Sequence, residues 1–315
     1  MKRFREFGEC VRLAILVTLA FAVAGCSAPA LQDDAPPPEP TYALPPASSG
    51  VLAELAGTVA EQGEPDHSGF MLLDTSHASL LWRLALIDSA TSSIDIATYL
   101  WYPDHTGKLL LERAVHAAER GVHVRLIIDD LLTIGQEAFM ADIESHPNIE
   151  LRLFNPWKKR GISGRAAAMI AQMERLNVRM HDKLLIADSH AAILGGRNIG
   201  DHYFGLGKHY NFYDLDVLGV GPVAVQASEM FDHFWNSEMV VSAKFLSTES
   251  DPERAQTSWE NLQANSRQAP ELERFPRAVR QWTAELQALP GQLHLGESLI
   301  VYDRVDGQSI DQAMF

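Results

Sequence analysis

Residues 179–188 read RMHDKLLIAD, and residues 195–198 read GGRN. The first run puts a histidine and a lysine two positions apart, at the start of an apolar stretch that predicts a buried strand. On a strand, residues i and i+2 project from the same face, so His181 and Lys183 are expected to point side by side into one pocket. A nitrogen nucleophile beside a fixed cation suits attack on a phosphodiester, because the cation can hold the phosphate oxygens.

Strand and helix signals alternate on both sides of this run. Buried apolar segments predict strands at 93–101, 122–128, 149–154, 183–188, 191–195 and 213–220. Apolar residues at helical spacing predict helices at about 80–87, 109–120, 136–145, 165–175 and 223–238. The alternation favours an α/β layered fold, with a central sheet flanked by helices on both faces.

The spacing H-x-K-x4-D-x6-G-G-x-N resembles the HKD signature of the phospholipase D superfamily, which includes cardiolipin synthases, other phosphatidyltransferases and nucleases. Other stretches between residues 70 and 240 resemble the same family, such as SIDIATYLW at 93–101 and FDHFWN at 231–236. The run GGRNIGD at 195–201 is most similar to the lipoprotein-like cardiolipin synthases. The resemblance implies a phospholipase D-like sandwich with a mixed central sheet, and one complete lobe at residues 51–248.

The resemblance also implies roles for the motif residues. His181 is expected to be the nucleophile that forms a phosphohistidine, or else the acid that protonates the leaving group. Lys183 and the Asn198 amide are expected to hold the non-bridging oxygens, while Gly195 and Gly196 allow close backbone approach.

Further charged residues complete the candidate site. Asp214 is the expected carboxylate partner of His181, with Asp216 as the alternative, and a turn-capping role stays open for either. Asp188 belongs to the motif but should face away from His181, so it is expected to brace the backbone. Arg179 is expected to bind substrate.

The composition restricts the chemistry. The formal charge of −15 argues against a nucleic-acid partner. Both cysteines, Cys10 and Cys26, lie near the N-terminus, so residues 51–315 contain no thiolate ligand or disulfide. The mechanism needs no cofactor, and no metal site is expected. Asp129 and Asp130 are interpreted as strand-end residues, because no third ligand lies at a suitable spacing.

The N-terminal segment reads as a lipoprotein signal. Residues 1–25 combine a basic start with an apolar run, and VAGC at 23–26 matches a lipobox, so Cys26 is expected to be lipidated. Ser27 then favours the outer membrane, on the periplasmic side of the cell envelope; an uncleaved membrane anchor is the alternative. The proline-rich residues 26–50 predict an extended tether, with ordered structure beginning near Val51.

Residues 156–180 differ in charge from the rest of the chain. They carry six lysines and arginines against one glutamate, and include a short apolar run. This pattern favours contact with anionic lipid headgroups, so membrane phospholipids are the expected partner. An ordinary solvated helix is the alternative.

The chain contains a single H-x-K motif. Members of the family bring two HKD histidines together, from two lobes or from two subunits. Residues 249–315 predict a helical linker and the start of a second lobe, with a strand at 299–302. We therefore expect a truncated two-lobed enzyme, or alternatively a homodimer with a shared site.

The predicted function is phosphatidyl transfer of the cardiolipin synthase type. Phospholipase D hydrolysis differs only in the acceptor and stays open, as do a nuclease and an inactive lipid-binding fragment without the second motif.

Overall fold

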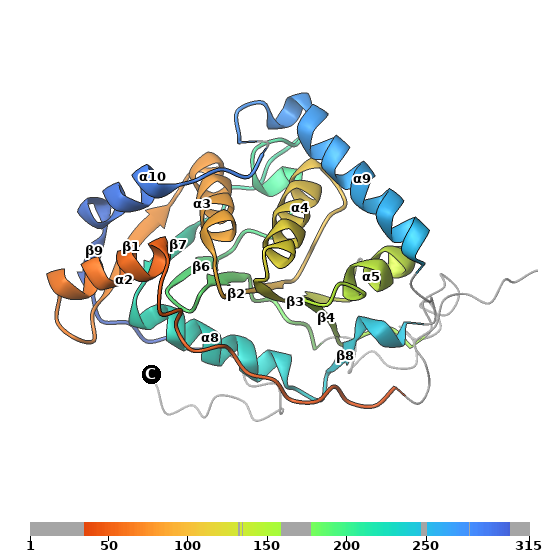
Figure 1. Cartoon of the computed structure of the whole chain (residues 1–315), viewed down its shortest axis with the longest axis horizontal. Helices are drawn as coiled ribbons and strands as arrows, with labels where there is room; N and C mark the ends of the chain where they lie inside the picture. Colours follow the sequence, from red (N-terminus) through yellow and green to blue (C-terminus); the bar gives the residue numbers. More distant parts are fainter. Residues whose placement is uncertain are drawn as a thin grey trace, which may run out of the picture.

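The computed structural model describes residues 35–131, 133, 135–158, 178–246, 251–276 and 278–302. Within these ranges the chain forms one nine-stranded sheet with helices on both faces (Figure 1). The strands are β1 (Ser68–Leu73), β2 (Ser93–Thr98), β3 (His123–Asp129), β4 (Ile149–Phe154), β5 (Leu184–Ala187), β6 (Ala191–Gly195), β7 (Asp216–Val220), β8 (Val240–Ser242) and β9 (His294–Gly296). The α-helices are α2 (Val51–Gln62), α3 (Ser76–Ser89), α4 (His105–Glu119), α5 (Glu137–Glu144), α8 (Pro222–Trp235), α9 (Pro252–Gln268) and α10 (Thr283–Ala288).

The sheet is mixed. Its strand order is β8-β4-β3-β2-β5-β6-β7-β1-β9, with β2, β3 and β4 parallel and every other neighbouring pair antiparallel. Ala97 of β2 lies opposite Leu184 of β5. Because these two strands are antiparallel, the residues just before β5 lie at the edge where β2 and β3 end. The HKD histidine is thereby brought to the carboxyl edge of the parallel strands.

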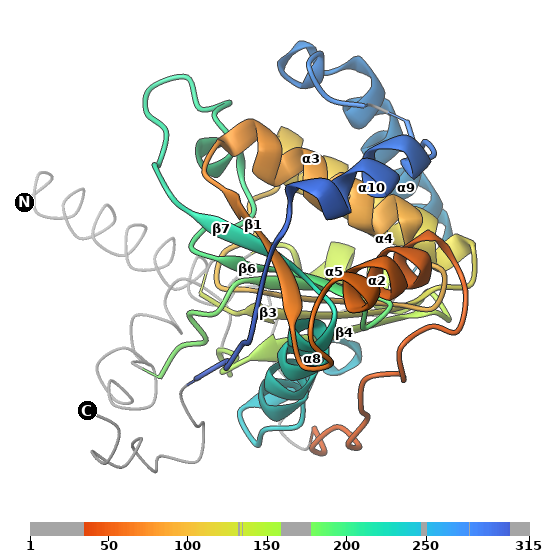
Figure 2. The same ribbon diagram turned by 90° about the vertical axis from the view of Figure 1, so that its left-hand side faces the viewer.

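Both faces of the central strands are buried. On β3, Leu126 and Ile128 belong to the core formed with α2, α3, α4, α5 and α9, while Ile127 belongs to the core formed with α8. Figure 2 shows α8 on one side of the sheet and α3, α4 and α9 on the other. Strands covered on both faces read as continuous apolar runs, which is the pattern that the sequence showed. The predicted layered α/β fold is confirmed.

The C-terminal segment differs from the prediction. Residues 299–302 are not a strand; the strand in this part of the chain is β9, which pairs with β1 at the edge of the same sheet. Ile300 instead packs on the α8 core, and its N–H donates to the Gln226 side chain at 3.2 Å. Burial alternates along this apolar run, because Ile300 and Tyr302 pack on the α8 core while Leu299 and Val301 are exposed. The expected helix at 165–175 lies outside the described residues.

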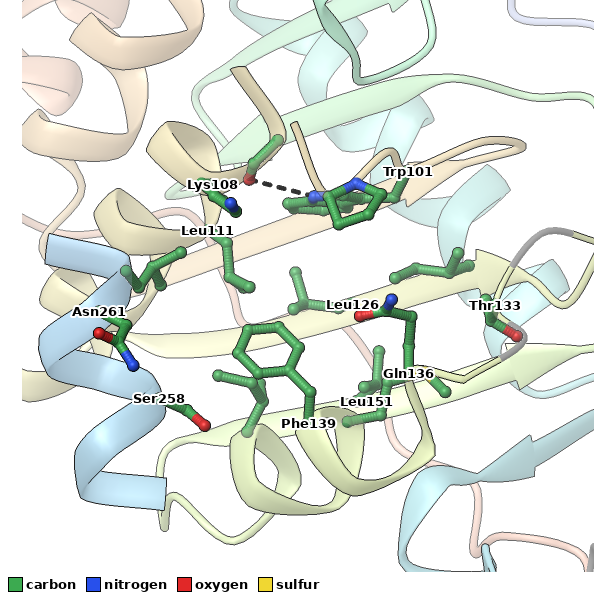
Figure 3. A pocket seen from close by; sticks show the side chains of 16 residues that line it. Trp101, Lys108, Leu111, Leu126, Thr133, Gln136, Phe139, Leu151, Ser258 and Asn261 are labelled. Carbon is green, nitrogen blue, oxygen red and sulfur yellow. Dashed lines mark hydrogen bonds between the residues drawn. The ribbon is translucent and has the colours of Figure 1, made fainter. Parts of the chain in front are cut away.

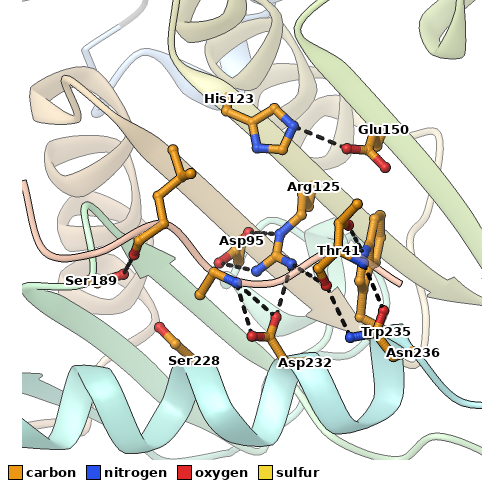
Figure 4. Close-up of polar contacts among 12 residues, drawn as sticks. Thr41, Asp95, His123, Arg125, Glu150, Ser189, Ser228, Asp232, Trp235 and Asn236 are labelled. Carbon is orange, nitrogen blue, oxygen red and sulfur yellow. Dashed lines mark hydrogen bonds and ion pairs between the residues drawn. The ribbon is translucent and has the colours of Figure 1, made fainter. Parts of the chain in front are cut away.

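Residues 39–49 lie along the domain (Figure 4). The Ala43 N–H donates to the Asp232 carboxylate at 2.8 Å. Arg125 holds the same carboxylate at 2.8 Å and also pairs with Asp95 at 2.7 Å. A hydrogen-bonded cluster of buried charges therefore fastens this segment to β2, β3 and α8.

The first described helix, α2, begins at Val51 as predicted, but residues 39–49 before it are docked on the domain, which the alternating prolines and polar residues did not indicate. The Ala47 N–H donates to the Asp188 carbonyl at 3.1 Å, and His190 binds the Ala47 carbonyl at 2.7 Å. The remaining residues of the expected tether, 26–34, lie outside the described part of the chain.

Candidate active site

His181 and Lys183 meet around one aromatic ring. The exposed His181 imidazole lies with its centroid 5.0 Å from that of Tyr99, and the Lys183 ammonium lies 5.5 Å from the Tyr99 centroid. Lys183 is only 6% exposed, and its ammonium donates to the His181 backbone carbonyl. The structure thus brings the two side chains together as the i, i+2 spacing predicts, with the imidazole open to solvent and the cation held beneath it.

The electrostatics of the pair favour a neutral imidazole. Partial burial lowers the pKa of His181 below its usual value, the Lys183 charge lowers it further, and Asp214 opposes both. Burial also lowers the pKa of Lys183, against the attraction of Asp182 and Asp214. An uncharged imidazole has a free lone pair at neutral pH, as a nitrogen nucleophile requires.

The two candidate carboxylates have different surroundings. Asp216 is buried at 1% exposure, where Arg83 lies 2.9 Å and Arg197 3.3 Å from its Oδ2. It is therefore committed to an internal ion cluster. Asp214 is half-buried and acts electrostatically on both His181 and Lys183, without a direct hydrogen bond to the imidazole among the described contacts. This favours Asp214 over Asp216 as the partner of the histidine.

Asn198 and the two glycines make contacts within the protein beside the His181 site. The Asn198 Oδ1 accepts from the Leu100 N–H at 3.0 Å, and its Nδ2 donates to the Tyr203 hydroxyl at 2.9 Å. One of its two amide N–H groups is therefore used within the protein. A side chain on Gly196 would overlap the Asp214 carboxylate, so this glycine makes room for Asp214. The backbone that approaches these glycines closely is that of the chain entering β7, which pairs with β6 at this point.

Asp188 lies at the opposite end of β5 from His181. It is fully buried and accepts hydrogen bonds from the backbone N–H groups of Thr91, Ser92 and Ser93. These contacts brace the start of β2, so the structure places Asp188 outside the reacting centre.

Arg179 is paired with an aspartate that the sequence did not assign to the site. Its guanidinium lies 3.0 Å from Asp129, and the other Asp129 oxygen accepts from the Met180 N–H at 3.2 Å. Burial raises the pKa of Asp129 to about 6, although Arg179 and these hydrogen bonds lower it. Asp129 therefore fixes the two residues that precede His181, and Arg179 is a positioning residue in this structure.

Asp129 and Tyr99 could be found only in part from the sequence. Asp129 was noted as the end of a strand, and Tyr99 was placed inside one. The sequence did not show that β2 and β3 end beside the start of β5, because that arrangement depends on the tertiary structure.

Other parts of the predicted site lie beyond the described residues. Cys26 and most of the basic segment 156–180 are among them. In the described ranges, no cluster of three or more histidine, cysteine or acidic residues could hold a metal ion. None of the described helices is both long and apolar enough to span a bilayer.

Comparisons with known proteins agree with the motif. Residues 84–235 match the family described as "Cardiolipin synthase, PLD-like domain". The chain is 39% identical to cardiolipin synthase C of Escherichia coli over 176 residues, which are 56% of this chain and 37% of that protein. It is 30% identical to the major cardiolipin synthase ClsA of Bacillus subtilis over 158 residues, 49% of this chain and 30% of that protein.

Among solved structures, NucT from Helicobacter pylori is similar over 56% of this chain and 98% of its own, at 19% identity and a TM-score of 0.40. The match to the two synthases, by contrast, spans well under half of their length. The HKD spacing, the mixed sheet and the similarity to the synthases together identify residues 84–235 as a PLD-like domain that is similar to those of cardiolipin synthases.

Proposed function

We propose that this domain supplies one catalytic half of a phospholipid phosphatidyltransferase of the cardiolipin synthase type. The observation that carries the proposal is the exposed His181 imidazole above the buried Lys183 ammonium, at the edge where β2, β3 and β5 meet. The similarity to cardiolipin synthases supports phospholipids as the substrate class.

The proposed reaction has two displacements at phosphorus. A ring nitrogen of His181 attacks the phosphodiester, a P–N bond forms, and the P–O bond to the leaving alkoxide breaks as that oxygen takes a proton from a general acid. The hydroxyl of a second phospholipid then gives its proton to the conjugate base of that acid and attacks phosphorus. The P–N bond breaks and His181 is restored. Lys183 stabilises the charge on the non-bridging oxygens in both steps.

The general acid is proposed to be the histidine of a second HKD lobe, from a further part of the protein or from a second copy of the chain. Asp214 stabilises the charged form of His181, because its carboxylate raises the pKa of the imidazole. Hydrolysis follows the same course with water as the acceptor, so the product distinguishes the two reactions.

Product analysis tests this proposal. The full chain is incubated with phosphatidylglycerol vesicles, and cardiolipin and phosphatidate are measured by mass spectrometry. We expect cardiolipin from the wild type and none from His181→Ala, while His294→Ala, which changes an exposed histidine of β9, keeps the activity. Phosphatidate as the main product would assign hydrolysis, and unchanged lipids with retained vesicle binding would assign a binding fragment.

We further propose that Cys26 carries lipid and holds the domain at the periplasmic face of the outer membrane. The support is the lipobox-like VAGC sequence at 23–26. Labelling cells with an alkyne fatty acid, followed by membrane fractionation, should give a labelled protein that Cys26→Ser abolishes. Cys10→Ser is the matched control and should keep the label.

A further inference from the structure

An apolar cavity of about 330 Å³ lies on the α4 side of the sheet (Figure 3). Its floor is Leu126 of β3 and Leu151 of β4, and its walls include Leu111 of α4, Phe139 of α5 and Leu262 of α9. Polar groups, among them Lys108, Thr133 and Gln136, lie toward its edges. A volume near the lower end of the roughly 300–1,000 Å³ range of small-molecule sites, with this lining, suits an apolar group such as a hydrocarbon chain.

The wall made by α9 is held in place by specific contacts. Arg254 binds Asp142 of α5 through two hydrogen bonds of 2.8 Å. Trp259 packs edge-on against His116 of α4, with ring centroids 5.4 Å apart. The α9 helix lies outside residues 84–235, the part of the chain that matches the family. The cavity is therefore built by combining the shared domain with a helix that follows it.

Two residues that line the cavity lie next to residues of the candidate site in the sequence. Its lining residue Trp101 is two positions after Tyr99, whose ring faces His181. Its lining residue Ile128 directly precedes Asp129, which holds the residues before His181. Two positions of extended chain span about 7 Å. One end of the cavity is thus lined by residues within two positions of Tyr99 and Asp129, one beyond the end of β2 and one near the end of β3.

We propose that this cavity binds one acyl chain of the phospholipid whose phosphate lies at His181 and Lys183. The inference rests on the proposed function and adds a subsite to it. A phospholipid at His181 has its acyl chains a glycerol's length from the phosphate, and an apolar cavity near that point would shield one of them from water. Each methylene buried in this way should strengthen binding by about fourfold.

Chain-length dependence of binding tests the subsite without requiring turnover. Monomeric lysophosphatidylglycerols with six to twelve acyl carbons are titrated into the full chain by calorimetry. We expect the affinity of the wild type to rise at least fivefold for each two carbons until the cavity is full, and then to level off. An affinity that does not change with chain length would overturn the proposal.

Two neighbouring substitutions on α9 provide the specificity control. Ser258→Phe places a ring in the cavity, whereas Thr257→Phe adds the same ring on the exposed side of the helix. We expect Ser258→Phe to reduce the gain per carbon to near zero and Thr257→Phe to retain it, with both variants melting within a few degrees of the wild type. Equal behaviour of the two variants would exclude this cavity as the acyl site.

Two further measurements distinguish acyl-chain binding from turnover, and phospholipid binding from the binding of other apolar ligands. His181→Ala should keep the chain-length dependence while losing any turnover, so a failure of the proposed transferase leaves this measurement intact. Fatty acids of matched length should bind at least tenfold more weakly, because they lack the phosphodiester. Equal affinity for fatty acid and lysolipid would overturn the link between this cavity and the phosphate site.

Discussion

The two ends of β5 place one sequence motif in two different environments. At its start, His181 is exposed, and the buried Lys183 beside it carries an ammonium whose pKa is lowered by burial. At its end, Asp188 is fully buried and accepts hydrogen bonds from residues 91–93. One end has polar groups that are open to a ligand, and the other uses its polar group to complete the fold.

The contrast shows that a residue's place in a motif does not define its task. Asp188 lies five residues after Lys183, yet its contacts are with the start of β2, far from the histidine. Asp129, outside the motif, touches the residues next to His181. We therefore expect substitutions at the open end to change the reaction, and substitutions at the closed end to change the stability.

Among the charged residues around His181, Lys183→Ala should give the largest effect on the reaction. Loss of the cation is expected to lower kcat/KM for phosphatidylglycerol by about 10³-fold, because a preorganised charge at the phosphate is removed. The free energy of unfolding should change by less than about 1 kcal/mol, because the variant also removes the cost of burying the ammonium. Steady-state kinetics and urea unfolding measure the two quantities. Wild-type turnover in this variant would contradict the role of Lys183.

Asp188→Ala should give the opposite pattern. The backbone N–H groups of residues 91–93 would lose a charged acceptor, so the free energy of unfolding should fall by about 3 kcal/mol. Folded protein, isolated at low temperature, should keep kcat/KM within a few-fold. A stable variant with a thousandfold loss of kcat/KM would instead place Asp188 in the chemistry.

Asp129→Asn should alter the dependence on pH. The folded pKa of about 6 is above the usual value, so the folded state binds more protons than the unfolded state between about pH 4 and 6. The stability that Asp129 contributes is therefore present below about pH 4 and is lost as the pH rises through about 6. The charged carboxylate that remains above pH 6 binds Arg179 and the Met180 N–H, so activity should rise through the same range.

In the Asp129→Asn variant, both the fall in stability and the rise in activity near pH 6 should be weaker. We expect kcat/KM at pH 7.5 to drop by about tenfold, in line with a misplaced catalytic group. Thermal melts and pH–rate profiles of the variant and the wild type measure this difference. Unchanged profiles would show that Asp129 does not position His181.

Asp214→Asn should have the smallest effect on rate, a few-fold in kcat/KM, because its carboxylate acts on His181 without a direct hydrogen bond among the contacts of the described residues. Its charge raises the pKa of His181, so its removal should move that pKa further down, whereas Lys183→Ala should move it up. NMR titration of the His181 ring protons measures both shifts. Shifts of the same sign in the two variants would contradict this electrostatic arrangement.

Much of the fold was accessible from periodicity alone. The strand at 149–154 and the helix over 223–238 were placed within a few residues, because apolar runs and breaks between them are local signals. The edge strands β8 and β9 were missed, as was β1 beside β9, and residues 299–302 were misassigned. Short edge strands depend on which partner is nearby, and periodicity carries no information about that.

The sequence by itself predicted that His181 and Lys183 lie together at the start of β5, since residues i and i+2 of an extended segment share a face. Tertiary structure alone decided which charged groups surround that pair. Asp129 reaches the histidine segment because β3 ends beside it, whereas Asp216 is drawn into a cluster with Arg83 and Arg197. The cavity beside α9 likewise exists only after distant segments pack together, because long-range contacts depend on the whole sheet and its helices.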